Sequence, residues 1–161
     1  SLKFLITSFI LPAVVRGSRD LIPFSRLQVS SPMVVEVITE PKRSQASLDV
    51  AADSLGLGWT VKASVEPMTF GYTLLLGMDE RAIRQGYHWS SSSGKATLRV
   101  PEPLKEVSTT GGAKVLVDVV TNAVLADTKS SLTVMKFETP NVNRTSFFMS
   151  STGANVTVQE G

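Results

Sequence analysis

Between residues 59 and 139 the chain is a series of short segments of β type, each ended by a turn signal. In residues 59–65 apolar and polar side chains alternate, which is the pattern of a strand with one buried face. Short strands separated by turns are typical of β-sandwiches and barrels, so the sequence predicts an all-β fold rather than an α/β enzyme. The segments are residues 59–65, 72–78, 96–100, 114–120 and 131–137.

The rest of the chain adds strands and two short helices to this series. Residues 33–39 are rich in β-branched side chains, and residues 3–15 are also strand-like. Apolar residues recur at helical spacing in residues 46–55, and residues 79–85 suit a helical turn capped by Asp79. The sequence predicts a single eight-stranded jelly-roll β-sandwich with one or two short inserted helices.

Several stretches lack a clear strand pattern. Residues 16–20 are predicted to form a turn, residues 21–29 to be irregular, and residues 101–106 to bend after a strand. No internal repeat is apparent. We therefore expect one jelly-roll domain over residues 1–140 and a C-terminal surface tail over residues 141–161, which are rich in Ser, Thr and Asn.

Composition limits the classes of function. The chain has 161 residues, 42% of them apolar and 19% charged. Low charge is typical of a protein that meets other protein over much of its surface, although a β-rich composition has the same effect. The absence of cysteine excludes disulfides, thiolate nucleophiles and Cys-ligated metals. The net charge of +2 comes without any basic run of the kind that tight RNA binding needs.

The first residues resemble a signal peptide, because Lys3 precedes an apolar run over residues 4–11. That run is far shorter than the roughly 20 residues of a membrane span, and we expect a buried strand instead. The initial Ser1 fits release from a larger precursor, and equally a trimmed chain.

The order of the predicted elements resembles one known family. Strand 59–65 is followed by the glycine-bounded strand 71–77, then by the aromatic segment His88-Trp89-Ser90, and residues 132–138 form the last strand. This order is similar to the capsid-protein jelly roll of picorna-like plant viruses, the group of comoviruses, nepoviruses and cheraviruses. A single jelly roll resembles most the cheravirus arrangement, in which the capsid proteins are separate chains.

The resemblance implies a structural capsid protein of an icosahedral RNA-virus shell, found in the virion and, during assembly, in the host cytoplasm. Its partners would be identical and sibling capsid subunits and, weakly and without specificity, the enclosed positive-strand RNA, but no membrane. Candidate RNA contacts, which could also be solvated surface, are Arg16, Arg19, Arg26, Lys42 and Arg43. Candidate intersubunit loops, which could also be ordinary hairpin turns, contain Pro67, Met68, Thr69, Phe70, Ser91, Ser92, Gly111 and Gly112.

No motif points to catalysis, a metal or a cofactor, and we expect none of them. His88 lies in an aromatic segment that suggests packing, and Asp79 and Glu80 suit helix capping better than acid–base chemistry. Asn143 and Asn155 lie in glycosylation sequons, which matter only in a secreted protein. They keep open an alternative function, a secreted or cell-surface β-sandwich module for binding or adhesion.

Overall fold

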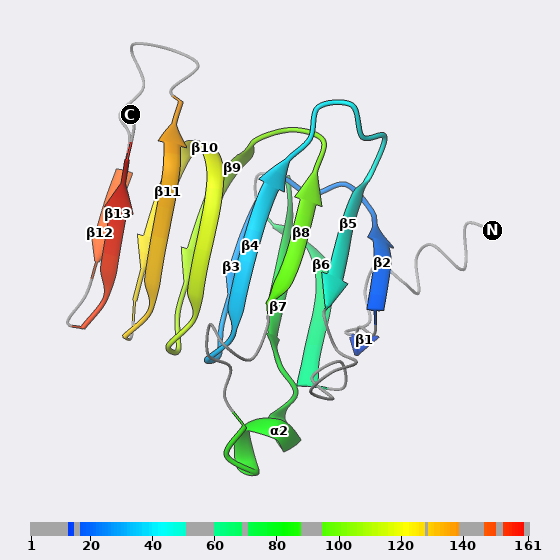
Figure 1. Ribbon diagram of the computed structural model, residues 1–161, viewed down its shortest axis with the longest axis vertical. Helices are drawn as coiled ribbons and strands as arrows, with labels where there is room; N and C mark the ends of the chain where they lie inside the picture. Colours follow the sequence, from blue (N-terminus) through cyan, green and yellow to red (C-terminus); the bar gives the residue numbers. More distant parts are fainter. Residues whose placement is uncertain are drawn as a thin grey trace.

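The computed structural model describes residues 13–14, 17–50, 60–68, 71–87, 95–127, 129–138, 147–150 and 153–159. These residues form strands and one short helix, so the predicted all-β class is confirmed (Figure 1). The strands are β1 (Ala13–Val14), β2 (Gly17–Leu21), β3 (Arg26–Val29), β4 (Val34–Thr39), β5 (Ala46–Val50), β6 (Val61–Met68), β7 (Gly71–Met78), β8 (Ala96–Val100), β9 (Leu104–Thr109), β10 (Lys114–Ala126), β11 (Ser131–Phe137), β12 (Phe147–Ser150) and β13 (Asn155–Val158), and the helix is α2 (Glu80–Arg84).

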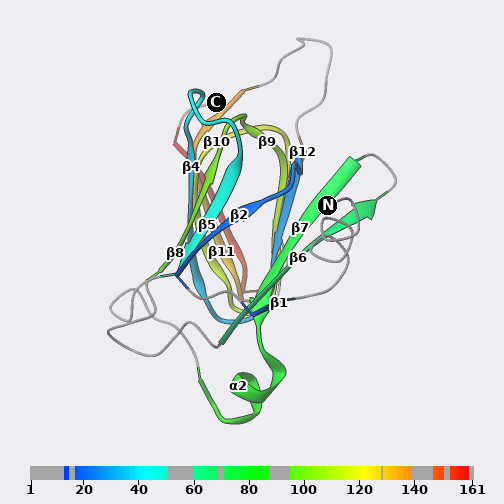
Figure 2. The same cartoon turned by 90° about the vertical axis from the view of Figure 1, so that its right-hand side faces the viewer.

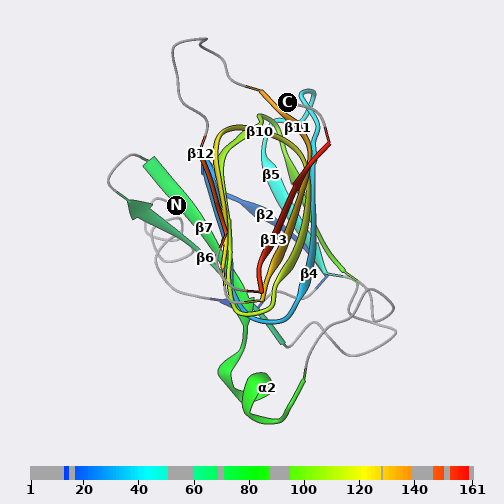
Figure 3. The ribbon, with the colours of Figure 1, turned by 90° about the vertical axis from the view of Figure 1, so that its left-hand side faces the viewer.

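The strands form two facing layers, which Figures 2 and 3 show edge-on. The front sheet of Figure 1 has the order β2-β5-β8-β4-β10-β11-β13. The back sheet has the order β1-β6-β7-β3-β9-β10-β12. The long strand β10 belongs to both, because its first half pairs with β4 and β11 and its second half with β9 and β12.

Four units of the same design stack along the molecule, and we call each one a rung. A rung is a back strand, a connection of four residues and a front strand. The rungs are β3–β4, β9 with the first half of β10, the second half of β10 with β11, and β12–β13. Equivalent residues lie side by side in parallel strands. One such row in the front sheet is Val35, Val115, Leu132 and Val156.

The core lies between the two sheets and is made of one face of each strand. In β4 and β11 buried and more exposed residues alternate, which is why these segments read as half-buried strands. Leu27, Leu74 and Leu132 are among the side chains that are almost fully buried. Burial of a side chain of this size contributes about 1.5–3 kcal/mol, so the rungs are held mainly by packing between the sheets.

The rung turns require unusual backbone conformations. Gly111 has φ 63° and Lys129 has φ 57°, both in the left-handed region. The turns also stack closely, because a Cβ placed on Gly111 would lie 2.9 Å from the backbone nitrogen of Ser31 in the turn of the preceding rung. Glycine at position 111 is therefore needed both for its φ and for the space it leaves.

Residues 40–103 form an insert between the first and second rungs. Within it β5 pairs antiparallel with β8, and β6 and β7 form an antiparallel hairpin. Figure 2 shows this hairpin running at an angle to the other back-sheet strands. The helix α2 follows β7, and the Asp79 carboxylate caps it by accepting a hydrogen bond from the Arg81 backbone N–H at 2.8 Å. Hydrogen bonds from Arg81 lower the pKa of Asp79 to about 2.

Several predicted elements agree with the structure. The strands expected over residues 72–78, 96–100 and 131–137 correspond to β7, β8 and β11, and the helical turn capped by Asp79 is α2. Of the strand expected over residues 3–15, residues 13–14 are described and form β1.

Other local predictions were wrong. Residues 46–50 form β5 rather than a helix, because β2 and β8 supply hydrogen-bonding partners on both sides; residues 51–55 lie outside the described residues. The expected turn at residues 16–20 contains most of β2, and the segment expected to be irregular over residues 21–29 contains β3. The chain does bend after β8, at residues 101–102, but β9 already begins at Leu104, within the segment that was expected to bend.

The strand pairing also differs from that of the predicted jelly roll. A jelly roll is built from antiparallel strands, whereas eight of the twelve pairings among described strands are parallel. The rungs are an internal repeat that the sequence did not reveal. Residues 147–150 and 155–158, expected within a surface tail, form the fourth rung.

Candidate functional site

A cavity of about 490 Å³ opens at the end of the molecule where β2, β4 and β8 finish, at the top of Figure 1. Its walls come from three connections: residues 22–25, residues 44–45 and residues 101–103. Its floor contains Leu21, Ala46 and Val100, which are 7%, 5% and 2% exposed. Three segments that are far apart in sequence thus meet over an apolar floor.

Proline explains why the chain leaves the sheets at this end. Pro23 lies between β2 and β3, and Pro101 and Pro103 lie between β8 and β9. Proline has no backbone N–H, so it ends the pairing of a strand without leaving an unsatisfied donor. The three proline rings line the cavity together with Phe24, and they make its walls apolar and stiff.

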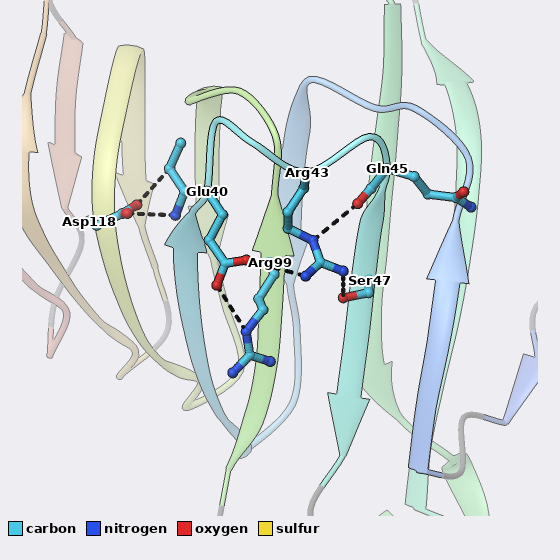
Figure 4. Close-up of polar contacts among 7 residues, drawn as sticks. Glu40, Arg43, Gln45, Ser47, Arg99 and Asp118 are labelled. Carbon is cyan, nitrogen blue, oxygen red and sulfur yellow. Dashed lines mark hydrogen bonds and ion pairs between the residues drawn. The ribbon is translucent and has the colours of Figure 1, made fainter.

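A network of ion pairs holds the β4–β5 connection, which forms one side of the opening (Figure 4). The Glu40 carboxylate lies between two guanidinium groups, Nη1 of Arg43 at 3.2 Å and Nε of Arg99 at 3.2 Å. Arg43 also donates through Nη2 to Oγ of Ser47 at 2.8 Å. Each exposed pair contributes little energy, but together they fix the shape of this connection.

Hydrogen bonds tie the other walls to the sheets. The side-chain amide of Gln45 donates to the carbonyl of Leu21 at 3.5 Å, which joins the second connection to the end of β2. The backbone N–H of Lys105 donates to the carbonyl of Ser25 at 2.8 Å. The cavity is therefore held open by the fold itself.

The polar groups of the cavity lie at its rim. Ser44, Gln45, Glu102 and Lys105 are exposed and Ser25 is half-buried, whereas the floor is buried. Pockets of 300–1,000 Å³ with apolar walls and a few polar groups are the usual form of a small-ligand site. The arrangement can take an apolar group inside while the polar end of a ligand stays in water.

The structure does not gather the candidate RNA contacts into one surface. Arg26 lies on the outer face of the back sheet and pairs with Glu106 at 3.1 Å. Arg43 belongs to the Glu40 network, Lys42 is exposed beside it, and Arg19 lies on the edge strand β2. Arg16 lies outside the described residues.

The candidate intersubunit loops also separate. Met68 is 49% exposed at the end of β6, next to exposed Pro67. Gly111 and Gly112 lie instead in a rung turn, against residues of the preceding turn. The remaining positions, Thr69, Phe70, Ser91 and Ser92, lie outside the described residues.

The remaining predictions concern the glycosylation sequons, His88, metal sites and membrane segments. Asn155 is exposed on β13, while Asn143 and His88 lie outside the described residues. Among the described residues no group of three or more His, Asp or Glu side chains is placed to hold a metal. Within the same part of the chain, no helix has the length and apolar character to cross a membrane.

No known protein family matches the sequence, and no curated protein matches it either. Two solved structures are similar in outline. The putative lipid binding protein of Parabacteroides distasonis is 18% identical, with a TM-score of 0.42, and the comparison covers 92% of this chain and 59% of that one. The putative adhesin of Bacteroides fragilis is 9% identical, with a TM-score of 0.35, over 92% of this chain and 95% of that one.

Sequence reasoning missed the cavity. Its prolines were visible as strand-ending signals, but nothing local indicates that residues 22–25 and 101–103 face one another. That proximity comes from the parallel pairing of β3 with β9, which joins segments separated by the whole insert.

Proposed function

We propose that the chain is a binding or adhesion module and that the end cavity receives an apolar group of its ligand. The observation that carries the proposal is the preformed cavity of about 490 Å³ with a buried apolar floor. A cavity that is already open when the ligand arrives costs little ordering entropy on binding, which favours affinity. The ligand can be a small molecule or an apolar side chain presented by a partner.

Filling the cavity tests this proposal. Ser44→Trp places a large side chain at the rim, and because position 44 is exposed the substitution displaces no core residue. Ser18→Trp, on the exposed face of β2 and away from the cavity, is the matched control. Small apolar probes such as indole and cyclohexanol are titrated while backbone NMR shifts are recorded.

We expect saturable shifts in the segments that line the cavity, a loss of affinity of at least about tenfold in Ser44→Trp, and no change in Ser18→Trp. Shifts scattered over the surface, or equal affinity in both variants, would contradict the proposal. If the ligand is instead an apolar side chain of a partner protein, a peptide that carries such a side chain should also bind more weakly to Ser44→Trp than to Ser18→Trp.

A capsid role, which the family resemblance implies, stays a second proposal. The exposed end of the β6–β7 hairpin, with Met68 and Tyr72 49% and 42% exposed, would suit contact with a neighbouring subunit. We rank it second because the resemblance depends on a jelly-roll strand order, and the described strands pair in a different order. Electron microscopy of material from the native source tests it: closed isometric particles would favour it over the binding module.

A further inference from the structure

Among the described strands, the fourth rung is the last of the stack in both sheets (Figures 1 and 3). Among the described strands, β13 pairs only with β11, and β12 pairs only with β10. The backbone N–H groups of Asn155 and Gln159 donate towards β11, to the carbonyls of Ser130 at 3.0 Å and Val134 at 2.9 Å. Successive residues of a strand direct their backbone N–H and C=O groups to opposite sides of the strand. The backbone groups of Val156 and Val158 therefore point away from β11.

The apolar core reaches this open end. Along one row of the front sheet, Val35, Val115 and Leu132 are 1%, 3% and 0% exposed. Val156 occupies the same row in the last rung but is only half-buried, since it has a described neighbour on one side. Among the described residues, no strand continues this row beyond Val156.

The two ends of the front sheet differ in charge. The edge strand β2 carries Arg19 and Asp20, and charged residues on an edge strand discourage pairing with other chains. The strands β12 and β13, with the sequences FFMS and NVTV, contain no charged residue. Exposed apolar side chains lie one strand inside this edge, with Met135 on β11 and Leu125 on β10, which are 40% and 36% exposed.

We propose that two copies of this chain associate edge to edge through β12 and β13. A single two-fold axis perpendicular to both sheets would pair β13 antiparallel with its copy and β12 with its copy, because both sheets end at the same rung. Because β12 and β13 carry no charged residue, the two copies would not repel each other at this edge. The second copy completes the burial of Val156 and Val158 and satisfies their backbone groups.

A pair of matched charge substitutions tests the dimer. Thr157→Lys places a charge on the exposed face of the edge strand, where the two-fold axis brings it close to its copy. Thr133→Lys introduces the same charge at the neighbouring position one strand inside, since Thr133 and Thr157 are paired in register. Molar mass is measured by light scattering after size exclusion, and circular dichroism checks that each variant is folded.

We expect the mass of a dimer for the unmodified chain and for Thr133→Lys, and half that mass for Thr157→Lys. A monomeric unmodified chain up to high micromolar concentration would overturn the proposal. Equal dissociation by both substitutions would overturn it as well, because the effect would then not come from the edge.

Single cysteines provide a second and independent measurement, because the chain has no cysteine of its own. Opposed residues in an antiparallel pair have Cα atoms about 4.5–5.5 Å apart, within the range of a disulfide. Only the residue at the two-fold axis faces its own copy, so one of Asn155→Cys, Val156→Cys, Thr157→Cys, Val158→Cys and Gln159→Cys is expected to give a covalent dimer on mild oxidation. Thr133→Cys is expected to give none, and failure of all five edge variants would contradict the proposed pairing.

Discussion

The rungs and the insert of residues 40–103 are built by different means. In the rungs each strand lies beside a parallel strand that is distant in sequence, as β3 lies beside β9. In the insert the hairpin of β6 and β7 joins strands that are adjacent in sequence, and α2 is capped by its own Asp79. Local signals are therefore enough to specify the hairpin and α2, whereas the rungs depend on the stacking of equivalent turns and rows.

This difference predicts how far the destabilising effect of a substitution extends through the molecule. A rung contributes to two sheets and contacts rungs on either side, so a defect in one rung reaches its neighbours. The hairpin of β6 and β7 meets the rungs through a single pairing, that of β7 with β3. A defect there should remain more local.

The largest effect is expected from emptying the core of a rung. Leu132→Ala removes a side chain that is fully buried in β11 and should lower the free energy of unfolding by about 2–5 kcal/mol. Leu74→Ala, equally buried in the hairpin, should cost a similar amount. Hydrogen exchange should separate the two, with loss of protection in β10 and β13 for Leu132→Ala and mainly in β6 and β7 for Leu74→Ala.

Chemical denaturation of Leu125→Ala gives the control for this pair, because Leu125 is 36% exposed on β10. We expect a loss below about 1 kcal/mol for it. A comparable loss for Leu125→Ala, or the same pattern of exchange for both core variants, would remove the distinction between rung and insert.

A smaller effect is expected from the glycines, and it compares the same two regions. Gly111 in a rung turn and Gly86 after α2 both have positive φ, 63° and 80°. Gly111→Ala meets the backbone nitrogen of Ser31 at 2.9 Å, whereas Gly86→Ala meets nothing within 4 Å. We expect a loss of about 1 kcal/mol for Gly86→Ala, from the conformation alone, and at least about 2 kcal/mol for Gly111→Ala.

Thermal and denaturant unfolding of the two glycine variants would measure this difference. Equal losses would mean that the rung turns are not stacked as closely as the structure shows.

The smallest effect concerns the cap of α2 and depends on pH. The pKa of Asp79 is lowered to about 2 in the folded chain, below its ordinary value of 3.8. The ionised carboxylate therefore stabilises the fold fully above about pH 4, and this contribution is lost as the pH falls towards 2. Asp79→Asn should lower the denaturation midpoint slightly at neutral pH, and the difference from the unmodified chain should shrink in acid.

Asp49→Asn, on the exposed face of β5, is the control for the helix cap. Its denaturation midpoint should equal that of the unmodified chain at neutral pH. If Asp79→Asn behaved in the same way, the hydrogen bonds from Arg81 would contribute nothing to stability.

The sequence predicted some local elements, such as β8 and α2, but it did not predict how the strands pair. Residues 96–100 alternate apolar and polar side chains, and that alternation is the physical property of a strand with one buried face. The sequence of Asp79 followed by residues 80–84 likewise contains all the groups that cap the helix. Such features depend on residues that are close together in the sequence, so they can be predicted from the sequence alone.

The repeat could not be predicted from the sequence, because its units share strand pairing and the length of their connection rather than residue types. Positions 26, 106, 123 and 147 share one row of the back sheet, but they carry Arg, Glu, Ala and Phe at uneven spacing along the chain. Alternation alone does not distinguish a parallel from an antiparallel neighbour. The jelly roll was the prediction that followed from alternation with short turns, and the cavity was missed for the same reason.

The parallel stacking of rungs is the central claim, and paired cysteines test it most directly in this cysteine-free chain. The parallel register places Val34 beside Lys114, whereas Ile38 lies four residues further along β4, about 13 Å away. Val34→Cys with Lys114→Cys should form an intramolecular disulfide, and Ile38→Cys with Lys114→Cys should not. The reverse result, a disulfide only between positions 38 and 114, is what antiparallel pairing of these strands requires and would contradict the stacked rungs.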